Sequence, residues 1–109
     1  MYHKQKFLNG LGLIQRARKL IYGDDLMNAI TSNKAGLVIL STDASERTKK
    51  QYRDKCAFYN VNLIEFCTKE EISSAIGMNN RVAVGIDDRG FIKMIQNSRL
   101  NIEEVKPNE

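Results

Sequence analysis

Residues 35–45 read AGLVILSTDAS, and this stretch decides the fold. Its centre, LVIL at residues 37–40, is an unbroken apolar run of the kind found in strands that are covered on both faces. A buried helical segment is the alternative, but four residues between Gly36 and a polar cluster are too few for one. A long charged segment follows at once, so the stretch predicts a strand that leads into a helix, as in an α/β domain.

The segments on either side of this strand show helical and extended patterns in turn. Apolar residues recur at three- and four-residue steps in the helical segments, and two further short apolar runs are expected to be strands. The expected helices span residues 5–21, 24–30, 46–59 and 69–76 and start again at residue 91, and the expected strands span residues 37–40, 61–67 and 81–86. Because helices that connect strands of one sheet lie on its faces, the sequence predicts a three-layer α/β/α sandwich.

Polar residues that can cap helices stand at the start of most helical segments. Their side-chain oxygens can accept hydrogen bonds from the free N–H groups of the first turn. The expected caps are Asp24 or Asp25 for the second helix, Asp43 or Ser45 for the third, and a Thr68–Glu71 capping box for the fourth.

Length and composition indicate one globular domain at residues 1–100, followed by a loose polar tail at residues 101–109. No window approaches about 18 apolar residues and no apolar segment follows the N-terminus, so we expect a cytoplasmic protein without a membrane span. Cys56 and Cys67 stand eleven residues apart, which favours packed thiols over a disulfide or a redox pair. His3 is the only histidine, so we expect no structural zinc, no other metal and no cofactor.

The positive charge of the chain is concentrated in two segments. Residues 1–21 carry five Lys or Arg residues and no acid, and residues 46–60 carry five bases against two acids, within a net charge of +4. Such clusters indicate a polyanionic partner, with nucleic acid as the first candidate. A merely solvated basic surface explains the same charges, and charge alone leaves both interpretations open.

The inventory of reactive groups is too small to predict an enzyme. The aspartates at residues 24–25, 43 and 87–88 could form an acid–base or metal site, but each also fits a helix cap or a turn. No histidine is placed to act as a base, and the sequence holds neither a nucleophile elbow nor a phosphate-binding P-loop.

Two segments have the chemistry of a binding site. The Gly23-Asp24-Asp25 helix start offers backbone donors and carboxylate acceptors within one turn. The loop from Ile76 to Arg81 combines apolar, amide and cationic side chains, which can pack on an unstacked base and contact the adjoining RNA backbone. Ordinary capping and an ordinary loop remain the alternative for both.

Several motifs, taken together, resemble the bacterial YlxQ-like branch of the kink-turn-binding ribosomal protein family. The resemblance covers residues 8–96 in order, and its DASxxTKK and DKCxxY segments are specific rather than generic. The matching motifs are LGLIQRARKL at residues 11–20, YGDD at 22–25, KAGLVILSTDASERTKK at 34–50, DKCAFYNV at 54–61, TKEEISSAIG at 68–77, RVAVGI at 81–86 and DRGF at 88–91.

The resemblance implies a mixed four-stranded sheet, with the additional strand around residues 20–22 and a first helix that ends near Lys19. It also implies a non-enzymatic protein that reads the sheared G·A pairs of a kink-turn with the start of its second helix. A loop before the last strand would cover an extruded nucleotide. Carried over by position, the RNA-binding residues are Gly23, Asp24, Asp25 and Leu26, with Lys34 behind them, and Ile76, Gly77, Met78, Asn79 and Arg81.

This chain departs from the family pattern at one place that bears on function. The family's best RNA binders have Asn-Glu where this chain has Asp24-Asp25, followed by a lysine on the same helix, whereas here Met27, Asn28 and Ala29 supply no cation. Two functions therefore stay open: an RNA-binding protein for structured RNA such as ribosomal RNA, and a protein–protein adaptor with a weakened RNA face. No DNA or membrane partner is expected, and the sequence does not predict the oligomeric state.

Overall fold

The computed structural model describes residues 2–105, with side chains described for residues 4–98. Helices and strands alternate along this part of the chain, as the sequence predicts. The elements are α1 (Tyr2–Arg16), β1 (Leu20–Ile21), α2 (Asp24–Thr31), β2 (Leu37–Leu40), α3 (Glu46–Phe58), β3 (Asn62–Glu65), α4 (Lys69–Ile76), β4 (Ala83–Ile86) and α5 (Arg89–Val105).

The four strands form one mixed sheet in the order β1-β4-β2-β3. β2 pairs with β3 in parallel, and β4 is antiparallel to both of its neighbours. The two central strands, β2 and β4, are buried along their whole length, which confirms the interpretation of residues 37–40 as a covered strand. Val82 was expected within the last strand, but it is partly exposed and precedes the first paired residue.

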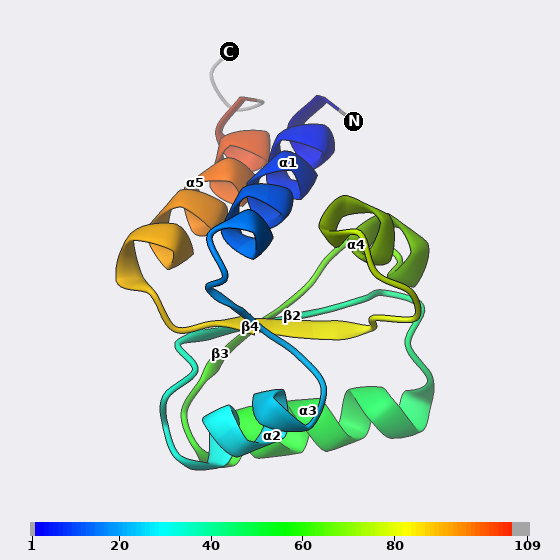
Figure 1. Cartoon of the computed structure of the whole chain (residues 1–109), viewed down its shortest axis with the longest axis vertical. Helices are drawn as coiled ribbons and strands as arrows, with labels where there is room; N and C mark the ends of the chain where they lie inside the picture. Colours follow the sequence, from blue (N-terminus) through cyan, green and yellow to red (C-terminus); the bar gives the residue numbers. More distant parts are fainter. Residues whose placement is uncertain (1, 106–109) are drawn as a thin grey trace.

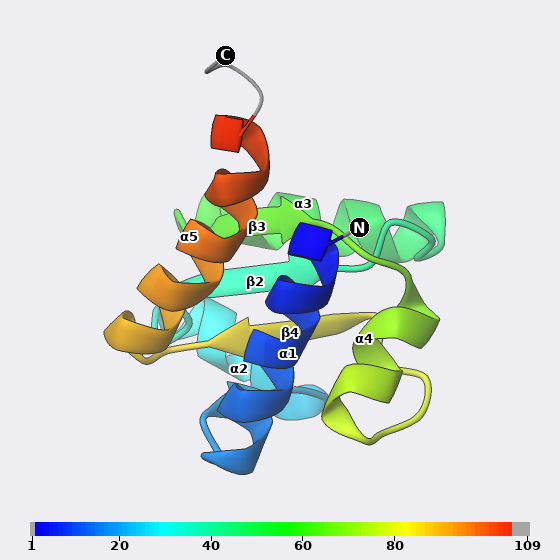
Figure 2. The same cartoon turned by 90° about the horizontal axis from the view of Figure 1, so that it is seen from above.

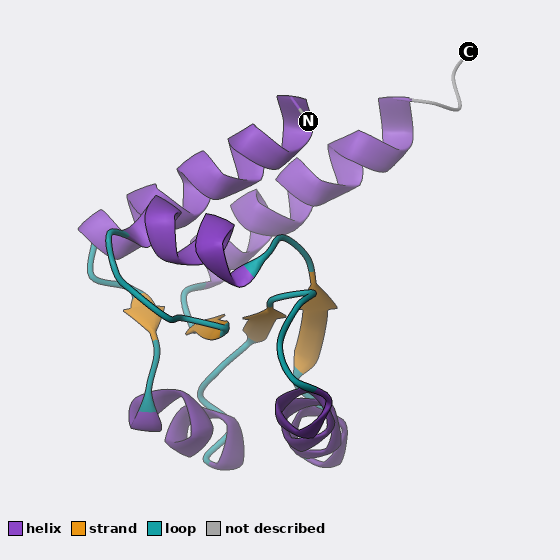
Figure 3. Ribbon diagram, turned by 90° about the vertical axis from the view of Figure 1, so that its right-hand side faces the viewer, coloured by secondary structure: helices purple, strands orange, loops and turns teal. Residues whose placement is uncertain are grey.

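Helices cover both faces of the sheet and make a three-layer sandwich (Figures 1 and 3). α1, α4 and α5 cover one face, and their buried residues form a cluster around Leu37, Ile39 and Val84. α2 and α3 cover the other face and pack on Val38 and Leu40. The alternation of side chains along β2 therefore divides the core between the two faces.

Helix α1 lies between α5 and α4, and two glycines let it approach both (Figure 2). A methyl group on Gly12 would come within 2.9 Å of the Ala75 carbonyl oxygen of α4, and one on Gly10 would come within 3.0 Å of Ile95 Cδ1 of α5. This close approach explains why two residues of low helix propensity stand inside α1.

The ends of two helices differ from the sequence prediction. α1 stops at Arg16, because the chain turns through Arg18 at a φ of 61° and enters β1, the strand implied by the family resemblance. α5 continues to Val105, so residues 101–105 are helical where a loose tail was expected, and the rest of that expected tail lies outside the described residues.

His3 belongs to α1, although its side chain is not described. None of the described helices is both long and apolar enough to cross a membrane.

Candidate nucleic-acid interface

The two segments that the sequence singles out meet at one edge of the sheet. The C-terminal ends of β1, β2 and β3 reach this edge, and β4 starts from it. Backbone bonds tie it together: the Ser41 N–H donates to the Val82 carbonyl, and the Thr42 N–H donates to the Cys67 carbonyl. α2, α3 and α4 each begin here, so the N–H groups of their first turns lie along the same edge.

The first turn of α2 has no side-chain cap. Gly23 occupies the N-cap position at a φ of 67° and a ψ of −145°, a conformation that favours glycine. The expectation that Asp24 or Asp25 caps this helix is therefore wrong, because both residues follow the cap and stand inside the first turn. Both are exposed, so their carboxylates and the neighbouring N–H groups are open to a ligand.

Leu26 packs between the first turn of α2 and the sheet, so its side chain is not available to a ligand. Its side chain is fully buried, and its N–H donates to the Gly23 carbonyl at 3.1 Å. A methyl group on Gly85 of β4 would overlap Leu26 Cδ1, so the glycine lets the leucine side chain pack directly on the sheet. This contact holds the start of α2 at the sheet edge.

Arg81 connects the second segment to the first. Its guanidinium carbon lies 4.9 Å from the centre of the Tyr22 ring, and its Nη1 would lie 3.6 Å from a methyl group on Gly23. The Ser73 hydroxyl accepts the Arg81 N–H at 2.8 Å and so fixes the backbone at this position. The Arg81 Nε is buried and has no hydrogen-bond partner in the structure. Arg81 therefore places a cation beside the acidic start of α2, where α2 itself offers none.

The loop between α4 and β4 divides into a buried part and an exposed part. Ile76 is only 5% exposed and packs in the core, so the expectation that it covers an unstacked base is wrong. Met78 is half-buried, and Gln15 Nε2 lies 4.0 Å from its sulfur. Gly77, with a φ of 71°, and Asn79 are exposed. Met78 and the exposed backbone of this loop remain able to pack on a base.

Lys34 lies apart from these residues. It follows the C-terminal end of α2 and is exposed, and its N–H donates to the Ala29 carbonyl. The eight residues of α2 span about 12 Å at 1.5 Å per residue, so Lys34 and Asp24 are at opposite ends of that helix. Lys34 can contact only a ligand that extends along α2.

The other candidate acids are held by structural bonds. Asp43 accepts the Lys69 N–H at 2.8 Å, and this bond holds the pKa of the Asp43 carboxyl below its ordinary value. Ser45, not Asp43, caps α3 by accepting the Thr48 N–H. Asp88 accepts the Phe91 N–H at the start of α5. The predicted capping box is confirmed, since Thr68 and Glu71 accept each other's backbone N–H groups.

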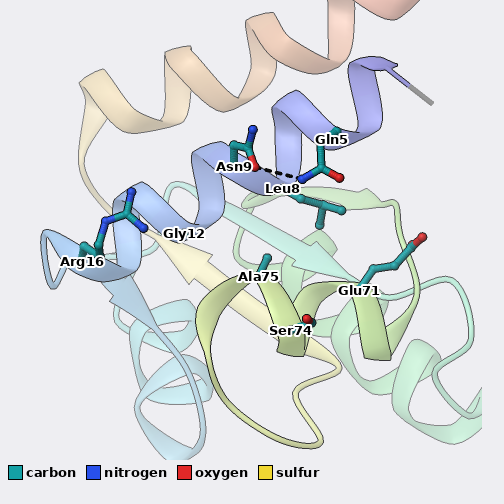
Figure 4. A pocket seen from close by; sticks show the side chains of 8 residues that line it. All are labelled: Gln5, Leu8, Asn9, Gly12, Arg16, Glu71, Ser74 and Ala75. Atoms are coloured by element: carbon teal, nitrogen blue, oxygen red, sulfur yellow. Dashed lines mark hydrogen bonds between the residues drawn. The ribbon is translucent and has the colours of Figure 1, made fainter.

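A groove of about 300 Å³ runs between α1 and α4, on the opposite face of the sheet from α2 (Figure 4). Its two charged side chains are Arg16 and Glu71, and Glu71 already binds Lys4 and the Thr68 N–H. These lining residues offer no acid–base pair for catalysis. The groove is lined by Gln5, Leu8, Asn9, Gly12, Arg16, Glu71, Ser74 and Ala75.

Both cysteines are free and buried, and burial raises the pKa of each thiol to about 11. Such thiols are poor nucleophiles at neutral pH. Within the described side chains, no three His, Cys, Asp or Glu residues are grouped in a way that could hold a metal ion.

Tyr22 is the site residue that the sequence did not reveal. The sequence indicated Tyr22 only as part of the YGDD motif and of the implied strand around residues 20–22, yet its ring stacks under the Arg81 guanidinium. The two residues are 59 positions apart, and only the pairing of β1 with β4 brings them together. A tyrosine next to a glycine gives no sequence signal for such a contact.

Comparison with known proteins supports this assignment of the fold. Residues 5–95 match the ribosomal protein L7Ae/L30e/S12e/Gadd45 family. The RNA-binding protein YlxQ of Enterococcus faecium is 44% identical over 92 residues, which cover 84% of this chain and 88% of that protein. The RNA-binding protein YlxQ of Bacillus subtilis is 40% identical over 82 residues, which cover 74% of this chain and 82% of that protein.

Two solved structures share the fold. A protein of unknown function from Bacillus halodurans superposes with a TM-score of 0.79 at 36% identity, covering 85% of this chain and 95% of its own. The 15.5 kDa RNA-binding protein of Giardia lamblia superposes with a TM-score of 0.74 at 15% identity, covering 95% of this chain and 90% of its own. At that identity the second likeness shows the fold alone.

Proposed function

Because this chain belongs to the ribosomal protein L7Ae/L30e/S12e/Gadd45 family, we propose that it binds RNA at the sheet edge formed by Gly23–Asp25 and Arg81. The proposed ligand is a kink-turn or a similarly irregular RNA, and the role is binding without catalysis. The observation that carries the proposal is the uncapped start of α2 with a cation beside it. This arrangement offers exposed acceptors, N–H donors and positive charge within one small area.

Each of these groups fits a different part of an irregular RNA. The carboxylates of Asp24 and Asp25 can accept hydrogen bonds from guanine imino and amino groups that a non-Watson–Crick pair leaves open. The first N–H groups of α2 and the Arg81 guanidinium suit phosphate oxygens. Met78 can pack on an unstacked base beside them. The cation that α2 lacks is thus supplied by the loop before β4.

The mutational test compares Asp25→Ala with Asp87→Ala. Both changes remove one exposed carboxylate, but Asp87 follows β4 and lies at the opposite edge of the sheet. The assay measures fluorescence anisotropy of a labelled kink-turn RNA and of the same RNA with its G·A pairs replaced by Watson–Crick pairs. Asp25→Ala should weaken kink-turn binding by about 1–3 kcal/mol, as the loss of a specific base contact does.

The outcome is judged on the preference for the kink-turn, because removing any acid raises the affinity for every phosphate backbone. Asp87→Ala should leave the preference unchanged, and Asp25→Ala should reduce it. Equal preferences in both variants would show that the start of α2 does not read the RNA.

Association with the ribosome is the second part of the proposal. The family description names ribosomal proteins, which supports structured ribosomal RNA as the partner. Sedimentation of a cell extract at low and high salt tests this part. Co-migration of the chain with ribosomal subunits at low salt, and its release at high salt, is the expected result, because phosphate contacts weaken with salt.

A further inference from the structure

We infer that α3 carries a second RNA-contacting surface, the α3 stripe, which binds a single RNA strand that leaves the structured element. The α3 stripe consists of Arg47, Gln51, Lys55 and Phe58. The inference rests on the proposed function in so far as RNA is the ligand. It concerns a different surface and a different part of that RNA.

Phe58 is the first observation. Its side chain is 80% exposed, against 44% for Leu13, the other large apolar side chain that the described part of the chain leaves open. The Phe58 ring packs edge-to-face on Tyr59, with 4.9 Å between the ring centres and 77° between the planes. Tyr59 is itself half-buried against the core, so the exposed ring is held in place. A single exposed aromatic residue is not unusual, and the charges around it decide its meaning.

The charges of α3 fall into paired and unpaired groups. Lys50 forms an ion pair with Asp54 at 2.8 Å, and Arg53 forms a bidentate ion pair with Glu65 of β3. Arg47, Lys49 and Lys55 have no such partner among the described side chains. Arg47 and Lys55 are exposed, whereas Lys49 is half-buried and, two positions from Arg47, lies on another side of the helix. Arg47 and Lys55 are therefore exposed cations of α3 that remain free to bind an anion.

Arg47 and Lys55 share a helix face with Phe58. The positions 47, 51, 55 and 58 follow one another at steps of four, four and three, which places them in one row along α3. Asp54 borders this row near Phe58, but Lys50 neutralises it. The row measures about 16 Å at 1.5 Å per residue. Arg47 lies in the first turn of α3, and Lys55 lies about one turn before Phe58.

This order of groups suits a single nucleic-acid strand. Proteins that bind such strands combine cations along the phosphate backbone with an aromatic ring on which a base stacks. Arg47 and Lys55 can each take a phosphate, the Gln51 amide lies between them, and the exposed Phe58 face can take a base. A protein partner docking on a helix would require several apolar residues at three- and four-residue steps, and the α3 stripe has one.

The helix that carries the α3 stripe lies beside the candidate site. α2 and α3 lie side by side on the same face of the sheet, and both begin at the same edge (Figures 1 and 3). Tyr52 of α3 lies close enough to Asp24 for that carboxylate to raise the pKa of the phenol, after the larger effects of burial and of Cys56. A strand that leaves the start of α2 can therefore pass directly onto α3.

The test compares a blunt kink-turn RNA with the same RNA extended at one end by about ten unpaired nucleotides, which is within the usual site size for single-strand binding. The extension is placed at either end in turn. The wild type should bind one of the extended RNAs about fivefold or more tightly than the blunt RNA, the lower end of the effect of one stacked base. Phe58→Ala and Lys55→Gln should remove this gain without changing affinity for the blunt RNA.

Lys50→Gln is the matched control, because it removes one α3 cation that Asp54 already neutralises, and the gain should survive it. Phe58→Ala removes an exposed ring and should leave the fold intact, which circular dichroism checks. If Phe58→Ala leaves the gain intact, or weakens blunt and extended RNA equally, the inference is overturned and a protein ligand for this face gains support.

A bare single strand of the same length separates this inference from the proposed function. Weak binding that is lost in Phe58→Ala but retained in Asp25→Ala supports the α3 stripe, whatever the preference for the kink-turn. If the wild type shows no preference for the kink-turn but still binds the bare strand, that result would contradict the proposed function and leave the inference about the α3 stripe standing. Failure of the wild type to bind either the bare strand or the extension overturns the inference alone.

Discussion

Replacement of Arg81 should affect both stability and RNA binding, and the structure gives the size of each effect. The guanidinium lies over Tyr22 at 4.9 Å, and Arg81 is half-buried. A cation–π contact contributes about 0.5–1 kcal/mol when exposed and about 2 kcal/mol when desolvated, so this half-buried one should contribute about 1 kcal/mol. Arg81→Ala should therefore lower the free energy of unfolding by about 1 kcal/mol in a urea titration.

The RNA measurement is the salt dependence of the affinity for the kink-turn. If Arg81 contacts one phosphate, Arg81→Ala should reduce the slope of log affinity against log salt by about 0.7–0.9. Arg81→Lys keeps the charge but loses the planar group that stacks on Tyr22, so it should keep most of the slope and lose part of the affinity. Lys93→Ala is the control, because Lys93 is exposed on α5, on the other face of the sheet.

The reasoning would be refuted if Arg81→Ala bound the kink-turn with the slope and affinity of Lys93→Ala. In that case the contact with Tyr22 would serve stability alone. The adaptor function, with a weakened RNA face, would then account better for this edge of the sheet.

Three further predictions concern the fold. Gly12→Ala should lower the free energy of unfolding by about 1–3 kcal/mol through overpacking against the Ala75 carbonyl of α4, although helix propensity alone favours alanine; chemical denaturation gives the sign. Ile39→Ala, at a fully buried position of a central strand, should cost about 2–5 kcal/mol by the same measurement. The Thr68 N–H holds the pKa of the Glu71 carboxyl below its ordinary value. The stabilisation that Glu71 contributes is therefore complete at a pH above the ordinary carboxyl pKa, and it is lost as the pH falls through the lowered pKa. Glu71→Gln should reduce the loss of stability between pH 7 and pH 3.

The sequence predicted the elements that local patterns determine. The apolar runs of β2 and β4 indicate buried strands because side chains on both faces of those strands meet helices. The Thr68–Glu71 spacing is itself the capping box, so no tertiary information was needed to find it. The two-residue β1 is too short to show a period, and only the family resemblance indicated it.

The interpretation of the candidate site went wrong where neighbouring residues or distant contacts decide the outcome. Asp24 and Asp25 are good capping residues, but Gly23 takes the cap position because its positive φ turns the chain from β1 into α2. Ile76 was assigned both to the end of the helix at residues 69–76 and to the loop that covers a base. As the last residue of α4 its side chain packs in the core, and the sequence pattern does not show this preference. The contact of Arg81 with Tyr22 depends on the register of Ile21 opposite Gly85, which no local pattern specifies.

The most direct test of the central claim is the preference of the wild-type protein for a kink-turn over a plain duplex of equal length. Because both RNAs carry the same number of phosphates, non-specific attraction contributes similarly to both affinities. Measured side by side over a range of salt concentrations, the kink-turn should bind at least about tenfold more tightly, which corresponds to one specific base contact. Equal affinities that fall together with salt would contradict RNA recognition at the Gly23–Asp25 edge.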